Sequence, residues 1–224
     1  MCGIAGVWYR GGDGPVGDDL ARMLLALSHR GRDGSGVAVY GGDGPPVIMK
    51  TARTPTELIE DHPLREATGS HGIGHVRMAT ETTVDVAHAH PFQGSATPQL
   101  TLVHNGHVTN ALALRDRLER DGARFHTDND SEVIAEFLAT RLGDGAELED
   151  ALADASRELD GTFSCLVATN DAMGIVRDRF AAKPLVVSET GDWVAVTSEG
   201  RGLPAGSGWR RCEAVAGEVR VWRR

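Results

Sequence analysis

The chain has 224 residues, 41% of them hydrophobic and 25% charged, with a formal net charge of -9 at pH 7 and a sequence pI of about 5.4. This hydrophobic content is enough for one large core, so we expect a single domain over residues 1–224. The excess of acidic residues excludes a nucleic-acid-binding surface, because such a surface needs clustered Lys and Arg. No apolar run reaches the roughly eighteen residues of a membrane helix, and the apolar N-terminal stretch is too short for a signal peptide, so we expect no membrane association.

The first part of the chain predicts strands around one helix. Leu20, Leu24 and Leu27 fall at helical spacing, and Asp18 or Asp19 is the expected N-cap of that helix. The chain then breaks at glycines, and short apolar runs bounded by Gly and Pro predict strands. We expect these early strands at residues 3–8, 37–40, 47–49 and 71–77.

The middle of the chain is helical and its end returns to strands. After a strand at 100–104, the apolar spacing predicts helices at 110–120, 131–142 and 147–159. Further strands are expected at 163–169, 174–177, 185–187, 193–197 and 218–222. This order gives an α+β layout without regular βαβ alternation, and two stacked sheets flanked by helices would accommodate it.

Cys2 is the most informative residue. Removal of Met1 would leave a thiol and a free α-amine on the same residue, with ordinary pKa values of about 8.5 and about 7.7 to 8.0. At neutral pH such an amine is partly free to take the thiol's proton, so the two groups form a nucleophile and its base. The alternative is that Cys2 is a small apolar residue at the start of a buried strand.

His104-Asn105-Gly106 supplies donors for an oxyanion. If a thiol attacks a carbonyl, the negative oxygen needs fixed hydrogen-bond donors, and the Asn105 amide together with the Gly106 N–H would provide two. The alternative is a tight Asn-Gly turn, which is a common use of this dipeptide.

Two further segments carry charges suited to a small amino acid. Arg77 ends a predicted strand and Thr80 follows it, so a carboxylate would find a guanidinium and a hydroxyl there; the alternative is a surface salt bridge. Asp128 and Asp130 precede a helix, where an N-cap is the ordinary interpretation and capture of an ammonium group the functional one. A thiol for an amide, an arginine for a carboxylate and an aspartate for an amine would together recognise free glutamine.

The segment from His29 to Gly36 combines charge with glycines that permit close backbone approach. It either shapes the wall of a site near Cys2, with Arg30 contributing to it, or forms only the end of a helix and a turn. Cys165 lies in an apolar run and is expected in the core. The three cysteines form no paired framework, which is typical of a reducing compartment, so we expect a cytoplasmic protein.

No metal or cofactor is expected. His88-Ala89-His90 is too short a spacing for a common zinc pattern, and neither a Cys-x-x-Cys pair nor a His-Glu-x-x-His helix occurs. The glycine patterns typical of dinucleotide and phosphate loops are absent as well.

Taken together, the motifs resemble those of the class II glutamine amidotransferases, which are N-terminal nucleophile hydrolases, and they occur in the family's order. They are Met1-Cys2-Gly3-Ile4-Ala5-Gly6, His29-Arg30-Gly31, Gly74-His75-Val76-Arg77, His88-Ala89-His90-Pro91-Phe92, His104-Asn105-Gly106 and Asp130-Ser131-Glu132. Asp160-Gly161-Thr162-Phe163, Arg177-Asp178 and Thr197-Ser198-Glu199 extend the likeness to about residue 200. Each motif alone is weak, whereas the ordered set is specific.

The resemblance implies a four-layer αββα sandwich whose mature chain begins at Cys2. It makes Cys2 the nucleophile, its α-amine the base, and Asn105 with Gly106 the oxyanion hole. The residues implied to bind glutamine are Arg77, Thr80, Asp130 and Arg30. Asp128 offers a second register for the carboxylate that binds the amine, and Asp130 is preferred because it directly precedes Ser131-Glu132.

The implied activity is hydrolysis of L-glutamine to glutamate and ammonia. Because the chain ends soon after the matching region, we expect a separate ammonia-accepting synthase subunit and a hetero-oligomer. Met78-Ala79-Thr80-Glu81 and the Asp-Asn-Asp spacing are most similar to glutaminase subunits of glutamate synthase and N-methylglutamate synthase systems. The alternatives are a non-catalytic scaffold subunit of the same fold and another cysteine amidase of this superfamily, which would need a wide apolar pocket.

Overall fold

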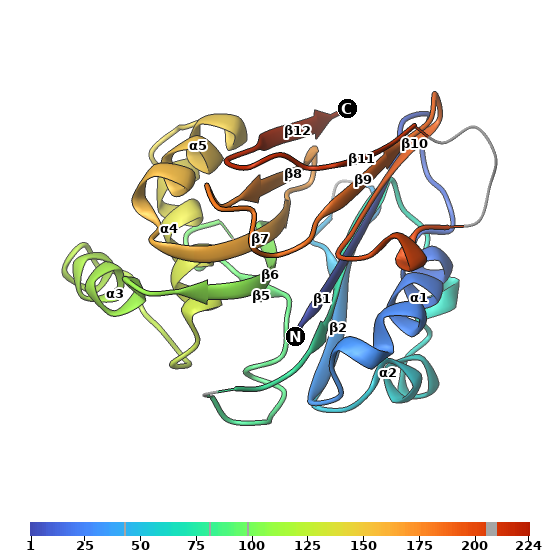
Figure 1. Ribbon diagram of the computed structural model, residues 1–224, viewed down its shortest axis with the longest axis horizontal. Coiled ribbons are helices and arrows are strands. Elements are labelled where there is room, and N and C mark those ends of the chain that lie inside the picture. Colours follow the sequence, from blue (N-terminus) through green and yellow to red (C-terminus); the bar gives the residue numbers. More distant parts are fainter. Residues whose placement is uncertain (43, 81, 98, 205–209) are drawn as a thin grey trace.

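Two antiparallel β-sheets are stacked face to face in the computed structural model, and helices cover the outer face of each (Figure 1). The structure describes residues 1–42, 44–80, 82–97, 99–204 and 210–224. Within them, no helix is long and apolar enough to cross a bilayer.

The larger sheet contains seven strands among the described residues. They are β1 (Gly3–Tyr9), β2 (Gly34–Tyr40), β3 (Val47–Thr51), β4 (His71–Arg77), β9 (Val186–Glu189), β10 (Trp193–Thr197) and β11 (Arg210–Glu213). Their order is β11-β9-β10-β1-β4-β2-β3, so β1 lies in the interior, between β10 and β4. The helices α1 (Val16–Leu27) and α2 (Pro55–Asp61) cover the outer face of this sheet. Short 3₁₀ turns occur at Ser28–Arg30, Leu64–Glu66 and Gly200–Gly202.

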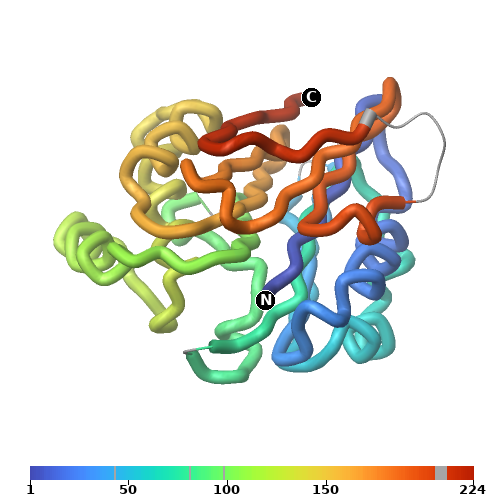
Figure 2. Tube along the Cα trace, viewed as in Figure 1, coloured from blue at the N-terminus to red at the C-terminus, as the bar shows by residue number. Residues whose placement is uncertain are grey.

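The smaller sheet contains five strands in the described part of the chain. They are β5 (Phe92–Gln93), β6 (Thr101–Val108), β7 (Gly161–Ala168), β8 (Ala172–Arg177) and β12 (Val219–Arg223), in the order β12-β8-β7-β6-β5. The helices α3 (Ala111–Arg120), α4 (Asp130–Gly143) and α5 (Leu148–Glu158) lie on its outer face (Figure 2).

Strand alternation divides the core into three layers. In β1, Ile4 and Trp8 face the second sheet, whereas Ala5 and Val7 face α1. Burial of each large apolar side chain contributes roughly 1.5–3 kcal/mol, so all three layers stabilise the fold. Helix, sheet, sheet and helix follow one another, which confirms the expected αββα sandwich.

Polar side chains also connect the two sheets. His71 Nε2 donates to the Thr169 carbonyl at 2.7 Å, and His75 Nε2 donates to the His104 carbonyl at 3.0 Å. Burial lowers the pKa of His71 to about 4 and that of His75 to about 3, so both rings are neutral at pH 7. The Tyr40 hydroxyl bonds across the same gap. These bonds fix the position of one sheet relative to the other.

Two helix starts differ from the sequence-based expectation. The predicted N-cap at Asp18 or Asp19 is wrong, because α1 begins at Val16 and both aspartates lie in its first turn, where they favourably face the helix N-terminus. Helix α2 was not expected. Its signal was present in the sequence, because Thr54 and Glu57 form a reciprocal capping box with Pro at the first helical turn.

Candidate active site

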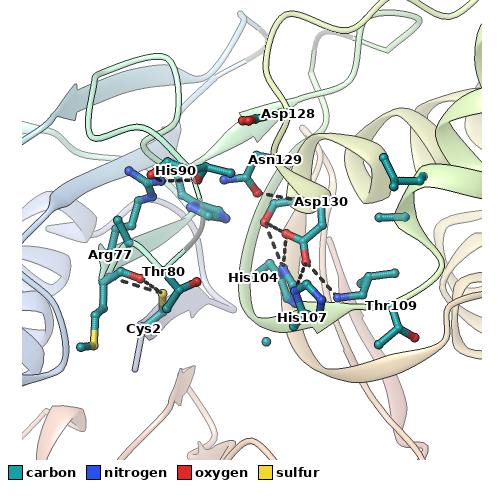
Figure 3. A pocket seen from close by; sticks show the side chains of 18 residues that line it. Cys2, Arg77, Thr80, His90, His104, His107, Thr109, Asp128, Asn129 and Asp130 are labelled. Atoms are coloured by element: carbon teal, nitrogen blue, oxygen red, sulfur yellow. Dashed lines mark hydrogen bonds and ion pairs between the residues drawn. The ribbon is translucent and has the colours of Figure 1, made fainter.

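A cavity of about 380 Å³ lies between the ends of the two sheets (Figure 3). Six of the residues singled out in the sequence line it: Cys2, Arg77, Thr80, Gly106, Asp128 and Asp130. The cavity therefore gathers residues that lie more than a hundred positions apart. Its size is suitable for a small ligand.

Cys2 lies at the start of β1 and is held against Met78. The Met78 N–H lies 3.5 Å from the Cys2 sulfur, and the sulfur lies 3.7 Å from the Met78 carbonyl oxygen (Figure 3). Burial raises the pKa of the Cys2 thiol, an effect that the Met78 backbone, the chain terminus and Arg77 only partly oppose. The thiol is thus protonated at neutral pH and requires a base. The α-amine of Met1 lies 2.6 Å from the Met78 sulfur.

Arg30 holds the backbone of Cys2 through a hydrogen bond. Its Nε donates to the Cys2 carbonyl at 2.8 Å, and its Nη1 pairs with Glu199. A Cβ on Gly31 would lie 2.3 Å from the Arg77 carbonyl carbon, so only glycine permits this approach. The segment is therefore both a turn and a wall near Cys2. Arg30 does not line the cavity, since its contacts are to backbone and to Glu199.

Asn105 and Gly106 lie inside β6, where they pair with Ser164 and Phe163 of β7. The alternative of a tight Asn-Gly turn is therefore wrong. Asn105 is buried behind the cavity wall, and its Nδ2 has no hydrogen-bond partner among the described residues. Gly106 lines the cavity, and a Cβ there would lie 2.7 Å from His104 Nε2. The Asn105 amide is therefore a buried donor without a partner in the described part of the chain, next to the cavity-lining Gly106.

Arg77 is buried at the end of β4 and is anchored by the segment that follows it. Its Nη2 donates to the Thr82 hydroxyl at 2.6 Å and its Nη1 to the Thr83 carbonyl at 2.9 Å. No carboxylate of the described residues lies within salt-bridge distance of it, so the surface salt-bridge alternative is wrong. Thr80 is exposed in the same segment, and Glu81 lies outside the described residues.

The two aspartates at the start of α4, Asp128 before the helix and Asp130 as its first residue, have different surroundings. The Asp128 side chain is 71% exposed and pairs with His88 Nε2 at 2.9 Å. That of Asp130 is only 20% exposed, accepts the Val108 N–H at 2.9 Å and lies 3.6 Å from His104 Nδ1. Although burial raises the pKa of Asp130, His104 and the Val108 N–H outweigh it and lower that pKa to about 2. Asp130 is therefore the permanently charged carboxylate inside the cavity.

Neither aspartate is the helix cap. The cap is Asn129, whose side chain accepts the Ser131 N–H at 2.9 Å. This arrangement leaves the Asp130 carboxylate available to the cavity, because the first orphan N–H groups of α4 are satisfied by a different residue.

Several lining residues were not anticipated: Thr82, His90, His104, His107 and Asn129. Sequence reasoning quoted His90 and His104 within motifs but gave neither side chain a role at the site beyond that of a possible metal ligand, and no group of three or more ligating side chains suited to a metal occurs among the described residues. His90 is instead fully buried and stacks on His75, with ring centroids 3.9 Å apart. Burial holds its pKa well below the usual value, so the ring is neutral.

Comparison with known proteins matches this geometry to one family. A family model described as glutamine amidotransferase domain matches residues 75–205. A protein of Methanothermobacter thermautotrophicus that bears a glutamine amidotransferase name is 32% identical, with 99% of each chain covered. Glutamine amidotransferase-like protein GlxB of Rhizobium meliloti is 42% identical over 75% of this chain and 55% of its own length.

A solved structure shares the fold. The glutamine phosphoribosylpyrophosphate amidotransferase from B. subtilis superposes with a TM-score of 0.83 at 27% identity, covering 99% of this chain and 49% of its own. This chain thus spans about half the length of GlxB and of that enzyme.

Proposed function

The chain belongs to the class II glutamine amidotransferase domain family, a family of enzymes, and on this basis we propose that residues 1–224 form one glutaminase domain that converts L-glutamine to glutamate and ammonia through a Cys2 thioester. One observation carries the proposal. A thiol, a buried guanidinium and a largely covered carboxylate converge on one cavity of amino-acid size, and Gly106 in its wall is next to Asn105, whose buried amide nitrogen has no partner among the described residues.

Glutamine is bound by its two charged ends. Arg77 takes the α-carboxylate through parallel N–H bonds, and the exposed Thr80 hydroxyl adds a further donor. Asp130 takes the α-ammonium. Because its pKa is held at about 2, it carries its charge at any pH at which the protein works. The amide end of the side chain is then directed toward Cys2.

The nucleophile is activated after Met1 is removed. While Met1 is present, the Cys2 nitrogen is a peptide amide and cannot accept a proton. Once released, this nitrogen becomes an α-amine with an ordinary pKa of about 7.7 to 8.0, and it takes the proton of the buried thiol as the sulfur attacks the amide carbon.

The intermediate is stabilised by β6. A C–S bond forms, and the amide oxygen becomes an oxyanion that accepts from Asn105 Nδ2 and the Gly106 N–H. The C–N bond then breaks, and the α-ammonium returns its proton to the departing nitrogen, which leaves as ammonia. Water attacks the thioester, the C–S bond breaks, and the thiol is restored with release of glutamate. Arg30 acts on this sequence as a positioning residue that holds the Cys2 carbonyl.

The ammonia passes to a separate synthase subunit. The narrower proposal is a glutamate synthase-like or N-methylglutamate synthase-like partner, supported by the likeness in residues 78–81 and in the Asp-Asn-Asp spacing. Copurification tests it directly. A flavin-containing, glutamate-synthase-like protein would support this acceptor, whereas a phosphoribosyl-binding partner would overturn it.

Cys2→Ala in the copurified complex tests the reaction itself. Glutamate release should fall by more than about 10³-fold, because the nucleophile is lost. Cys212→Ser is the matched control, since Cys212 is an exposed thiol that does not line the cavity, and its activity should be unchanged. Undiminished hydrolysis in Cys2→Ala would refute the assignment.

Intact mass spectrometry tests the activation step. We expect a mass lacking Met1 and stoichiometric labelling of Cys2 by 6-diazo-5-oxo-L-norleucine, an electrophilic glutamine analogue. A chain that retains Met1 and stays unlabelled would favour the scaffold alternative. Preferential hydrolysis of bulky apolar amides over glutamine would favour the other amidase alternative.

A further inference from the structure

A second cavity, of about 430 Å³, lies beside the first and is lined by two strands and one helix. Ile48 and Lys50 come from β3, Phe92 from β5, and Glu132 and Glu136 from α4. The segments 87–91 and 126–128 separate this cavity from the one that contains Cys2, since residues of both segments line each cavity.

The cation of this second cavity has no anionic partner. Lys50 Nζ lies 5.3 Å from the centre of the Phe92 ring, and among the described residues no carboxylate lies within 4.0 Å of it. Burial lowers its pKa to about 8, and the charges of Glu132 and Asp85 oppose this shift only in part. The Lys50 ammonium group therefore lies over the Phe92 ring at the cavity, without an ion pair to a described residue.

The anions of the cavity likewise have no buried cationic partner. Among the described residues, Glu136 is 3% exposed and accepts from the Ser95 N–H and hydroxyl alone, at 2.9 and 2.6 Å. Glu132 is 5% exposed and accepts the backbone N–H groups of residues 126 and 127 and the Thr127 hydroxyl. The Nδ1 of His126 lies 3.5 Å from Glu132, and the His126 side chain is 79% exposed.

Buried charges are ordinarily paired, because removing them from water is costly. Here one cation and two anions line the same cavity without pairing with each other. The two glutamates would repel a simple anion, and Lys50 would repel a simple cation. A zwitterion would satisfy both sides, and an apolar side chain on it would cover Phe92 and Ile48.

We propose that this cavity binds a free α-amino acid with an aliphatic side chain, its carboxylate on Lys50 and its ammonium on Glu132 and Glu136. This site is distinct from the glutamine cavity and goes beyond the proposed hydrolysis. Its existence depends on neither Cys2 nor the removal of Met1.

Isothermal titration with L-leucine, L-valine and L-methionine tests the proposal. At least one of them should bind, and its methyl ester and N-acetyl derivative should each bind at least tenfold more weakly, because each lacks one charge. Lys50→Met should weaken binding at least tenfold. The matched control is Lys183→Met, because Lys183 is the only other lysine of the chain and lies outside the cavity.

Two further variants keep the test decisive. Glu136→Gln should also weaken binding, and it removes a charge without removing the Ser95 contact, so it replaces Lys50→Met if that variant fails to fold. Asp130→Asn should leave binding unchanged, because Asp130 belongs to the other cavity. Absence of binding by all three amino acids would overturn the proposal. Binding that is lost in Asp130→Asn and retained in Lys50→Met would overturn it as well.

Discussion

The two walls of the cavity that contains Cys2 differ in how they are built. One wall is made by strand residues, with Cys2 directly before β1 and Gly106 inside β6, where Gly3 pairs with Val76 of β4 and Gly106 with Phe163 of β7. The other wall is the segment after Arg77, which exposes Met78, Val84 and Val86. Its outer part is tied to the rest of the molecule by His88, which bonds to Asp85 at 2.8 Å and to Asp128 at 2.9 Å.

This difference separates two tasks. Groups that must meet a transition state benefit from a fixed position, because their alignment then costs nothing during the reaction. Groups that admit and enclose a substrate need to move. The strand wall should therefore determine kcat, and the segment wall should determine KM.

After Cys2→Ala, the largest effect is expected for Asn105→Ala, which tests the strand wall. Loss of one oxyanion donor should lower kcat about 10² to 10³-fold with little change in KM. Initial rates of glutamate release from the copurified complex measure it. Thr80→Val is the matched change in the segment wall and should raise KM while kcat stays within about threefold. A large fall of kcat in Thr80→Val and none in Asn105→Ala would reverse the comparison.

Asp130→Asn should have the next largest effect. It removes the charge of a largely covered carboxylate that the proposed mechanism assigns to the substrate amine, so KM should rise about 10 to 100-fold. The control is Asp128→Asn, for which we expect less than about a fivefold change, because that carboxylate is 71% exposed and its pair with His88 is screened by water. The opposite ranking would assign the amine to Asp128.

A third prediction concerns the bonds that hold the strand wall in place. The folded-state pKa values of His71 and His75 are about 4 and about 3, below the ordinary value near 6.5. Between pH 6.5 and 4 the unfolded chain therefore binds protons that the folded chain excludes. Each of the two histidines should lower the free energy of unfolding by up to about 1.4 kcal/mol per pH unit as the pH falls through this range.

Urea unfolding at several pH values between 7 and 4.5 measures this slope. His75→Gln preserves a donor for the His104 carbonyl but does not titrate, so its slope should be smaller by the contribution of one histidine. His126→Gln is the matched surface control, because the His126 side chain is 79% exposed. Equal slopes in all three proteins would show that His75 is not a buried neutral group.

Much of the fold could be predicted from local patterns. The strands at 71–77 and 193–197 were predicted to the residue, because each apolar run ends at a charged or hydroxyl residue. The Asn-Gly dipeptide was ambiguous, since its turn propensity is local, whereas its place in β6 depends on pairing with β7 more than fifty residues later. Such pairing is a tertiary effect that a local signal does not contain.

The site was predictable where chemistry alone selects the residue. A thiol at position 2, an arginine at a strand end and an aspartate before a helix each indicate a role. The partners of these groups were not predictable. Thr82 anchors Arg77 only because of the path of the intervening segment, and His104 faces Asp130 only because α4 packs on β6. The second cavity, which Lys50 lines, combines elements separated by more than eighty residues, so no local sequence motif predicts it.

Cys2 and Gly106 belong to opposite sheets, and the layer between these sheets consists of side chains held together by packing and a few polar bonds. A sliding of one sheet past the other by a fraction of an ångström would leave the fold intact but would move the Cys2 sulfur away from Asn105 and Gly106, the oxyanion donors of the proposed mechanism. Turnover is then a more sensitive indicator of this alignment than any spectroscopic measure of unfolding. Under hydrostatic pressure, which acts on imperfectly filled interiors, catalysis should decline well before the chain denatures.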